Sequence, residues 1–98
     1  MEGNNKMANR INATDFNKLR KLASQHGEHV RFSYLDKEGK RTNVDTTIDA
    51  TTIRNDSLLT KNEDKGYRRY LFSNLQSDVE VGEYASLIAY GRKSWRIT

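Results

Sequence analysis

The chain of 98 residues contains no cysteine and no proline, and its two histidines, His26 and His29, lie three residues apart. Without cysteine there is no disulfide and no thiolate metal site. Two neighbouring histidines cannot hold a metal ion alone, because a protein metal site usually needs at least three side-chain ligands. We therefore expect neither a bound metal nor a cofactor. One of the histidines could interact with the negative end of a helix that stops nearby.

Long hydrophobic runs are also missing. None approaches the roughly 18 residues that cross a membrane as a helix. The first ten residues, MEGNNKMANR, lack the apolar centre of a secretion signal. We therefore expect a cytoplasmic protein that makes no contact with a membrane.

The residue groups that enzymes use are not recognisable in this sequence. Asp45 and Asp49 fall on one predicted strand, where four residues separate two carboxylates by about 13 Å, too far for a catalytic pair. We interpret them as solvated sheet surface. The glycines stand singly at turns, so no phosphate-binding loop is present. These absences predict a protein that is not an enzyme.

The composition has few hydrophobic residues, although enough for a folded domain, and an excess of positive charge. The chain is 35% hydrophobic and 31% charged, and its 17 lysines and arginines against 13 acids give a net charge of +4. A chain of this length suits a single domain. The first residues are polar, so we expect 1–10 to be a disordered extension and 11–98 to be the domain. The net charge favours an anionic partner.

Apolar residues at helical spacing follow the extension and predict a helix from about Thr14 to Gln25. Asn12 or Thr14 can cap its start, and Gly27 can end it. The basic residues on its other face are interpreted as a solvated surface. The predicted apolar face consists of Phe16, Leu19, Leu22 and Ala23.

Alternating side chains then predict a β-hairpin. Residues 30–34 and 41–49 alternate between apolar or threonine side chains and polar ones, and the DKEGK turn between them supplies Gly39 for a positive φ. A link over residues 50–56 leads to a third strand, SLLTKN, at residues 57–62. A short later strand places Val79 and Val81 inward.

The stretch GYRRYLFSNL, residues 66–75, combines two arginines with aromatic residues. If it is a strand, alternation gives each face one arginine and at least one aromatic ring. An arginine stem can then cover apolar neighbours while its head reaches water. One face would carry Arg68, Tyr70 and Phe72, and the other Tyr67, Arg69 and Leu71.

The C-terminal region, residues 83–98, permits two interpretations. A short helix could end at Gly91, or residues 86–90 could form a strand that pairs through GRK with SWRIT. We favour the strand. The order of helix, hairpin and further short strands then predicts a mainly β protein with one N-terminal helix, as an SH3/Sm-like small antiparallel β-barrel.

The segment VRFSYLDKEGKRT, followed by SLLTKNEDKGYRRYLFSNLQSDVEV, resembles the WYL-type domain. The resemblance spans residues 30–81. Tyr34 and Gly39 match the family's first motif, whereas the place of the name-giving tripeptide is taken by Leu58, Leu59 and Thr60, without tryptophan or tyrosine. The family's ligand-contacting arginine strand is matched by Arg68 or Arg69 with Tyr70, Leu71 and Phe72.

This resemblance implies a small Sm-like or SH3-like barrel that holds a nucleotide or nucleic acid, usually as a regulatory module. Because the tripeptide differs from that of the family, the resemblance does not indicate which ligand this chain binds. A single short helix stands where the family usually has a helix-turn-helix. A free-standing barrel of this kind is similar to the short phage-encoded branch of the family, which would place the protein in the host cytoplasm.

Candidate binding residues fall into three basic groups. Cations interleaved with aromatic rings suit single-stranded nucleic acid, since guanidiniums pair with phosphates and rings stack on bases. Trp95 can instead be a core residue, and the adjacent arginines can form salt bridges. On the hairpin, we expect Arg31 and Arg41 to face each other, where they would need an anionic partner or nearby acids such as Asp45 and Glu38. The candidates are Arg31, Arg41, Arg68, Arg69, Tyr70, Arg92, Lys93, Trp95 and Arg96.

We therefore predict a non-enzymatic module that binds nucleic acid, single-stranded in preference, or a free nucleotide. Its contact surface would combine the arginine strand with the basic C-terminal segment. The alternative is a small phage-type effector that binds and modulates a host protein through exposed aromatic residues. In either case an open barrel edge would allow copies of the chain to pair.

Overall fold

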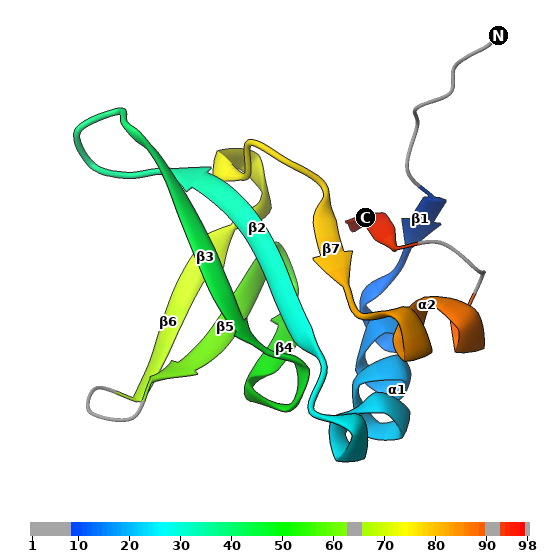
Figure 1. Cartoon of the computed structure of the whole chain (residues 1–98). Coiled ribbons are helices and arrows are strands. Elements are labelled where there is room, and N and C mark those ends of the chain that lie inside the picture. The colour runs from blue at the N-terminus through cyan, green and yellow to red at the C-terminus, as the bar shows by residue number, and fades with distance from the viewer. Residues whose placement is uncertain (1–8, 63–65, 90–92, 98) are drawn as a thin grey trace, which may run out of the picture.

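The computed structural model describes residues 9–62, 66–89 and 93–97 (Figure 1). Short strands dominate, and helices lie near both ends of the described chain. The strands are β1 (Asn9–Ile11), β2 (His29–Leu35), β3 (Arg41–Thr47), β4 (Thr51–Arg54), β5 (Ser57–Asn62), β6 (Gly66–Leu71), β7 (Val79–Val81) and β8 (Ser94–Ile97). The helices are α1 (Ala13–Ala23) and α2 (Glu83–Ala89), with 3-10 turns η2 (Ser24–His26), η3 (Ile48–Ala50) and η4 (Phe72–Asn74).

The strands form two sheets. The five-stranded sheet has the order β1-β8-β7-β2-β3, and the three-stranded sheet has the order β4-β5-β6. Only the β1–β8 pairing is parallel among the described strands. Within the described ranges the two sheets do not join into a closed barrel. The predicted mainly β class is confirmed, while closure is not observed.

Helix α1 forms where the sequence predicts it, although it ends at Ala23 rather than Gln25. The Asn12 side chain caps it by accepting the N–H of Asp15 at 2.8 Å. The chain then turns at Gly27, whose φ of 62° favours glycine. One residue departs from the predicted apolar face, because Leu22 is 52% exposed.

Two strands were not predicted. Strand β1 contains Asn9 and Arg10, which the prediction assigned to the disordered extension, while residues 1–8 lie outside the described ranges. Strand β4 occupies part of the predicted link. The side-chain amide of Asn17 on α1 donates to the Ile53 carbonyl and accepts the Ile53 N–H, both at 3.2 Å. This amide covers the outer edge of β4.

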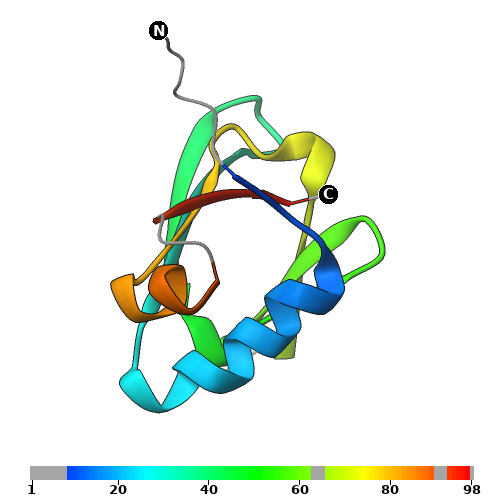
Figure 2. The ribbon, with the colours of Figure 1, turned by 90° about the vertical axis from the view of Figure 1, so that its right-hand side faces the viewer.

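The C-terminal region corrects the favoured prediction. Residues 83–89 form helix α2 and no strand. The SWRIT segment does contain a strand, β8, but it pairs with β7 and β1, which lies beside it in Figure 2. The predicted GRK turn falls mostly outside the described residues. No described helix is long and apolar enough to span a membrane.

The core joins both sheets to α1 in one cluster. Trp95 is 0% exposed, so its interpretation as a core residue is correct. Val79 and Val81 point inward as predicted. Helix α1 contributes Phe16, Leu19 and Ala23 to this cluster. The largest fully buried side chains are Trp95, Phe16, Ile48, Leu58, Val30 and Val79.

Candidate anion-binding site

Arg68 on β6 links the two sheets. Its Nη2 donates a hydrogen bond to the Tyr34 hydroxyl at 3.0 Å, and Tyr34 belongs to β2 in the other sheet. The Arg68 guanidinium carbon lies 5.6 Å from the Tyr34 ring centre and 5.2 Å from that of Tyr70. Distances in this range allow cation–π attraction. The side chain is therefore held in place by a hydrogen bond and two rings.

The two tyrosines beneath Arg68 form a rigid support. Their ring centres lie 4.8 Å apart with an interplanar angle of 63°, an edge-on arrangement that aromatic pairs favour. Burial raises the pKa of Tyr70 above its ordinary value of 10.0, so its phenol stays neutral at physiological pH. Arg68 and Tyr70 share a face of β6 as predicted, whereas Phe72 lies in η4.

A cavity of about 380 Å³ opens beside this cluster, and we call it the arginine–tyrosine pocket. Its cationic residues are Lys37, Arg68 and Arg69, and its acid is Asp36. The Asp36 carboxylate accepts the backbone N–H groups of Glu38 and Lys40 at 2.9 Å each. The pocket is lined by Tyr34, Leu35, Asp36, Lys37, Arg68, Arg69, Tyr70, Leu71 and Asn74.

These bonds commit the Asp36 carboxylate to the β2–β3 turn. The Lys40 N–H, as the main cause, lowers the pKa of Asp36 below its ordinary value of 3.8, so the group is ionised at neutral pH. Its Oδ1 accepts both backbone N–H groups, and its Oδ2 accepts the Thr42 hydroxyl at 3.4 Å. The cations of the arginine–tyrosine pocket therefore outnumber its acid, and that acid is occupied elsewhere.

The two arginines of β6 differ in their partners. Arg69 donates from Nε to the Ser57 hydroxyl at 3.0 Å, and its Nη2 lies 3.9 Å from an Asp56 carboxylate oxygen. Both charged side chains of that pair are exposed, so it is weak. Arg68 has no ion pair with any acid in the described ranges. Of these two arginines, Arg69 is the one that pairs with an acid of the described residues.

Tyr67 was not among the predicted site residues, although the alternation of β6 points to it. It is 63% exposed on the outer face of the three-stranded sheet. Lys61 lies directly opposite it on β5, and Arg69 lies two residues along on the same face. An accessible ring between two cations is a suitable surface for a stacked base.

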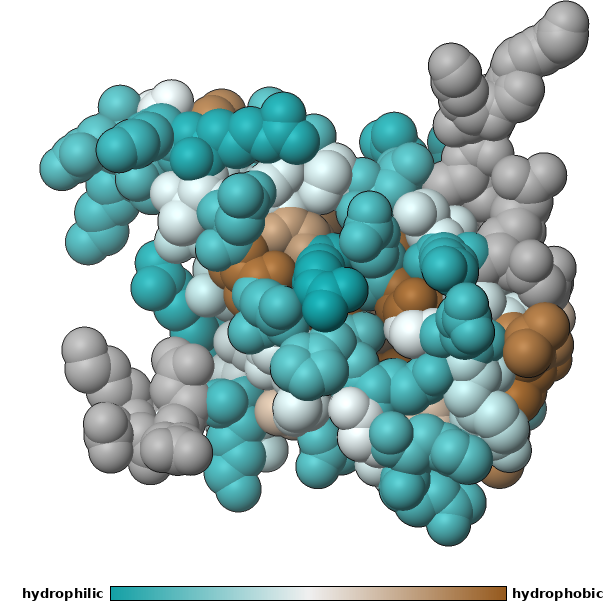
Figure 3. Space-filling view, viewed as in Figure 1, coloured by the Kyte–Doolittle hydropathy of each residue, from teal (hydrophilic) through white to brown (hydrophobic). Residues whose placement is uncertain are grey.

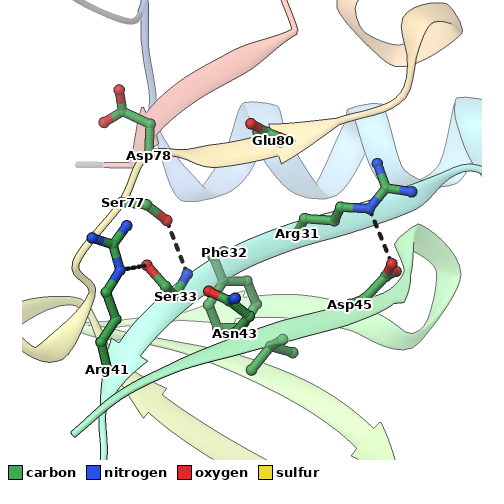
Figure 4. A pocket seen from close by; sticks show the side chains of 10 residues that line it. Arg31, Phe32, Ser33, Arg41, Asn43, Asp45, Ser77, Asp78 and Glu80 are labelled. Carbon is green, nitrogen blue, oxygen red and sulfur yellow. Dashed lines mark hydrogen bonds and ion pairs between the residues drawn. The ribbon is translucent and has the colours of Figure 1, made fainter.

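A second cavity of about 380 Å³ contains the hairpin arginines (Figure 4). Arg31 lies opposite Asp45 in the β2–β3 register and opposite Glu80 on β7, so the predicted pairing of Arg31 with Arg41 is wrong. Arg41 instead lies opposite Leu35. The observed register, in which Leu35 and Arg41 are paired next to the turn, places an acid, not a second cation, across from Arg31.

The charges of this second cavity are largely balanced. Arg31 contacts an Asp45 oxygen at 3.0 Å, and His29 Nδ1 contacts the other at 2.6 Å. Arg41 donates to the Ser33 hydroxyl at 3.0 Å. The lining residues are Arg31, Phe32, Ser33, Arg41, Asn43, Val44, Asp45, Ser77, Asp78 and Glu80, a mixture of both signs.

The basic C-terminal segment is also paired locally. Lys93 lies 3.3 Å from Glu83, and Arg96 lies 3.0 Å from Asp78. Arg92 falls outside the described residues. None of the described residues of this segment lines the arginine–tyrosine pocket, so the two parts of the predicted contact surface do not meet there.

Comparison with known proteins does not identify a family for this chain. No protein family, no curated protein and no solved structure matches the chain. Among the described residues no group of three or more histidines, cysteines or acids could hold a metal ion. Function must therefore be inferred from the arginine–tyrosine pocket itself.

Proposed function

We propose that the protein is a non-enzymatic module that binds nucleic acid, single-stranded in preference to a free nucleotide, through strand β6. One observation carries this proposal: the Arg68 guanidinium has no acidic partner among the described residues, yet two tyrosine rings and a hydroxyl fix its position. A fixed cation loses little entropy when it binds phosphate. Guanidinium can also contact two phosphate oxygens at once.

Bases would stack beside the phosphate contacts. Tyr34 and Tyr70 are 9% and 8% exposed, so their rings position Arg68 and are closed to a base. Tyr67 presents an open ring on the outer face of β6, between Lys61 and Arg69. Stacking on such a ring contributes about 1 to 3 kcal/mol per base. A single strand offers free base faces that a duplex hides.

We also propose that the fold is an SH3/Sm-like barrel and that the chain is related to WYL-type domains. Both proposals are supported by the pairing of β7 back to β2 and by η4 between β6 and β7. An isolated bridge also pairs Tyr34 of β2 with Leu75, which follows η4 on the way from β6 to β7. The resemblance implies a regulatory module, with phage origin and cytoplasmic location as its corollaries.

The first test is fluorescence anisotropy with labelled single-stranded and duplex oligonucleotides at about 50 mM salt. We expect the single strand to bind more tightly than the duplex. Unlabelled nucleoside monophosphate should compete poorly, because one phosphate replaces only part of the contact. Equal competition by the monophosphate would identify a nucleotide site instead.

Arg68→Gln should weaken single-strand binding about tenfold or more, since it removes a charged hydrogen-bonding group. Lys21→Gln is the matched control, because it removes the same charge from the exposed surface of α1. Circular dichroism should be unchanged in both. Equal effects of the two substitutions would show that only net charge matters and would contradict the assigned site.

A protein-binding module remains the second candidate, and it rests on the exposed hydrophobic residues of α2. Affinity capture from a lysate followed by nuclease treatment separates the two functions. Nucleic-acid binding predicts that captured material is lost with the nuclease. A stoichiometric protein that survives the treatment would favour the effector hypothesis.

A further inference from the structure

Helix α2 is oriented with its large apolar residues outward. Ala85 and Ser86 are buried, with exposures of 0% and 3%. Tyr84, Leu87 and Ile88 are 39%, 72% and 39% exposed. These three follow i, i+3, i+4 spacing and so share one face. An amphipathic helix of an isolated protein normally places such a face inward.

The exposed face continues onto α1. A cavity of about 220 Å³ separates the two helices, and Leu22 and Ile88 are both part of its wall. Figure 3 shows hydrophobic residues gathered on the surface over α2, at the right of the view. We call this surface the helical face, defined by Leu22, Tyr84, Leu87, Ile88 and the cavity, which is lined by Ile11, Asp15, Lys18, Leu19, Leu22, Ile88 and Ala89.

We propose that the helical face binds a second copy of this chain, in a symmetric dimer. A contiguous apolar patch on a small protein marks an interaction site. A two-fold contact brings the same patch of both copies together, so the patch must be complementary to itself. The helical face offers both parts of such a contact, the exposed Leu87 on α2 and a cavity between α1 and α2 that Ile88 lines.

The charges at the cavity also fit a second copy. Asp15 and Lys18 both line it, one residue of each sign. In the proposed dimer, Asp15 of each copy would lie near Lys18 of the other, which gives two attractive contacts. If all charges around the cavity had one sign, they would attract a different protein of opposite charge and repel a second copy. The mixed rim favours self-association.

Self-association would leave the β6 surface free. In Figure 1 strand β6 lies on the left and helices α1 and α2 lie on the right, so they occupy opposite sides of the molecule. The dimer would thus carry two outward-facing arginine–tyrosine pockets. The inference does not depend on what those pockets bind, and Arg68→Gln should dimerise normally.

Sedimentation equilibrium over a range of concentrations tests the dimer. The weight-average mass of the full chain should rise toward twice 11.3 kDa. Leu87→Lys should stay monomeric, since a buried charge opposes the contact. Leu35→Lys is the matched control, because Leu35 is an exposed leucine, at 38%, on β2, and it should dimerise like the unaltered chain. A monomer at millimolar concentration, or a Leu87→Lys chain that still dimerises, would overturn the inference.

If Leu87→Lys folds poorly, Leu22→Lys on α1 tests the dimer contact independently. A charge exchange then tests the symmetry directly. Asp15→Lys and Lys18→Glu should each associate poorly alone, because like charges meet across the axis. An equimolar mixture should associate at least tenfold more tightly than either, since both contacts become attractive again. A mixture no tighter than its components would refute the two-fold arrangement.

Discussion

Gly82 has no room for a side chain because the Glu28 side chain lies against it. A β-carbon added to Gly82 would stand 2.5 Å from the Glu28 carboxylate carbon and 2.8 Å from its Cβ. The same carboxylate accepts the N–H groups of Tyr84 at 2.6 Å and Ala85 at 2.7 Å. Glu28 therefore caps α2 from a distant part of the chain, and Gly82 makes this approach possible.

Gly82→Ala should lower the free energy of unfolding by about 1 to 2 kcal/mol, because the new methyl group displaces the cap. Urea denaturation measures this loss. Glu28→Ala should lower the free energy of unfolding by a similar amount. The double variant should lose much less than the sum, since both changes remove one interaction. Additive losses would show that Gly82 matters for another reason.

Asn17→Ala should destabilise the protein by about 1 to 3 kcal/mol, because the Ile53 N–H and carbonyl lose their amide partner. Hydrogen exchange at the Ile53 amide should become faster. The control is Asn43→Ala on the exposed surface of β3, which should change stability by less than about 0.5 kcal/mol. An unchanged Ile53 exchange rate would contradict the role assigned to Asn17.

Stability should fall in acid partly through Asp45. The hydrogen bond from His29, followed by that from Arg31, lowers the pKa of Asp45 below its ordinary value of 3.8. A lowered carboxylate pKa stabilises the fold above the unfolded pKa, and this contribution is lost as pH falls through the folded pKa. Asp45→Asn should therefore melt lower than the unaltered chain at pH 7.

The difference in melting temperature between these two chains should shrink below about pH 4 and vanish near pH 2, where both carry an uncharged group. Thermal melts across this range provide the measurement. A difference that is independent of pH would mean that packing, and not charge, makes Asp45 important.

Tyr67→Ala should weaken single-strand binding about tenfold, since it removes the accessible ring of β6. Tyr67→Phe should bind normally, because the ring face, and not the hydroxyl, contacts the base. Anisotropy with the same labelled strand compares the two. If Tyr67→Phe binds as poorly as Tyr67→Ala, the hydroxyl is required and stacking is not the main contribution.

Much of the fold follows from local pattern. Alternation over residues 30–34 and 41–49 predicts the β2–β3 hairpin because one side of β2 is buried and one side of β3 is half-buried. The C-terminal region shows the limit of this reasoning. Helix α2 buries alanine and serine and exposes Leu87 and Ile88, so its apolar pattern does not report which side faces the core. Strand β1 has three residues and depends on a partner, β8, at the other end of the chain.

The site was predictable in composition but not in pairing. Adjacent arginines and tyrosines drew attention to β6 in the sequence. Which cations are neutralised depends on long-range register, as for Arg31 with Asp45 and Arg96 with Asp78. The contact between Arg68 and Tyr34 joins different sheets across 34 positions of sequence, and no local pattern reveals it.

The salt dependence of single-strand binding tests most directly whether the β6 arginines contact phosphate. The affinity of the unaltered chain should fall steeply as salt rises, because phosphate contacts release counterions. Arg68→Gln/Arg69→Gln should reduce the slope of log affinity against log salt by about 1.4, at roughly 0.7 for each lost contact, while Lys21→Gln leaves it unchanged. Equal slopes for the double variant and the unaltered chain would contradict the account.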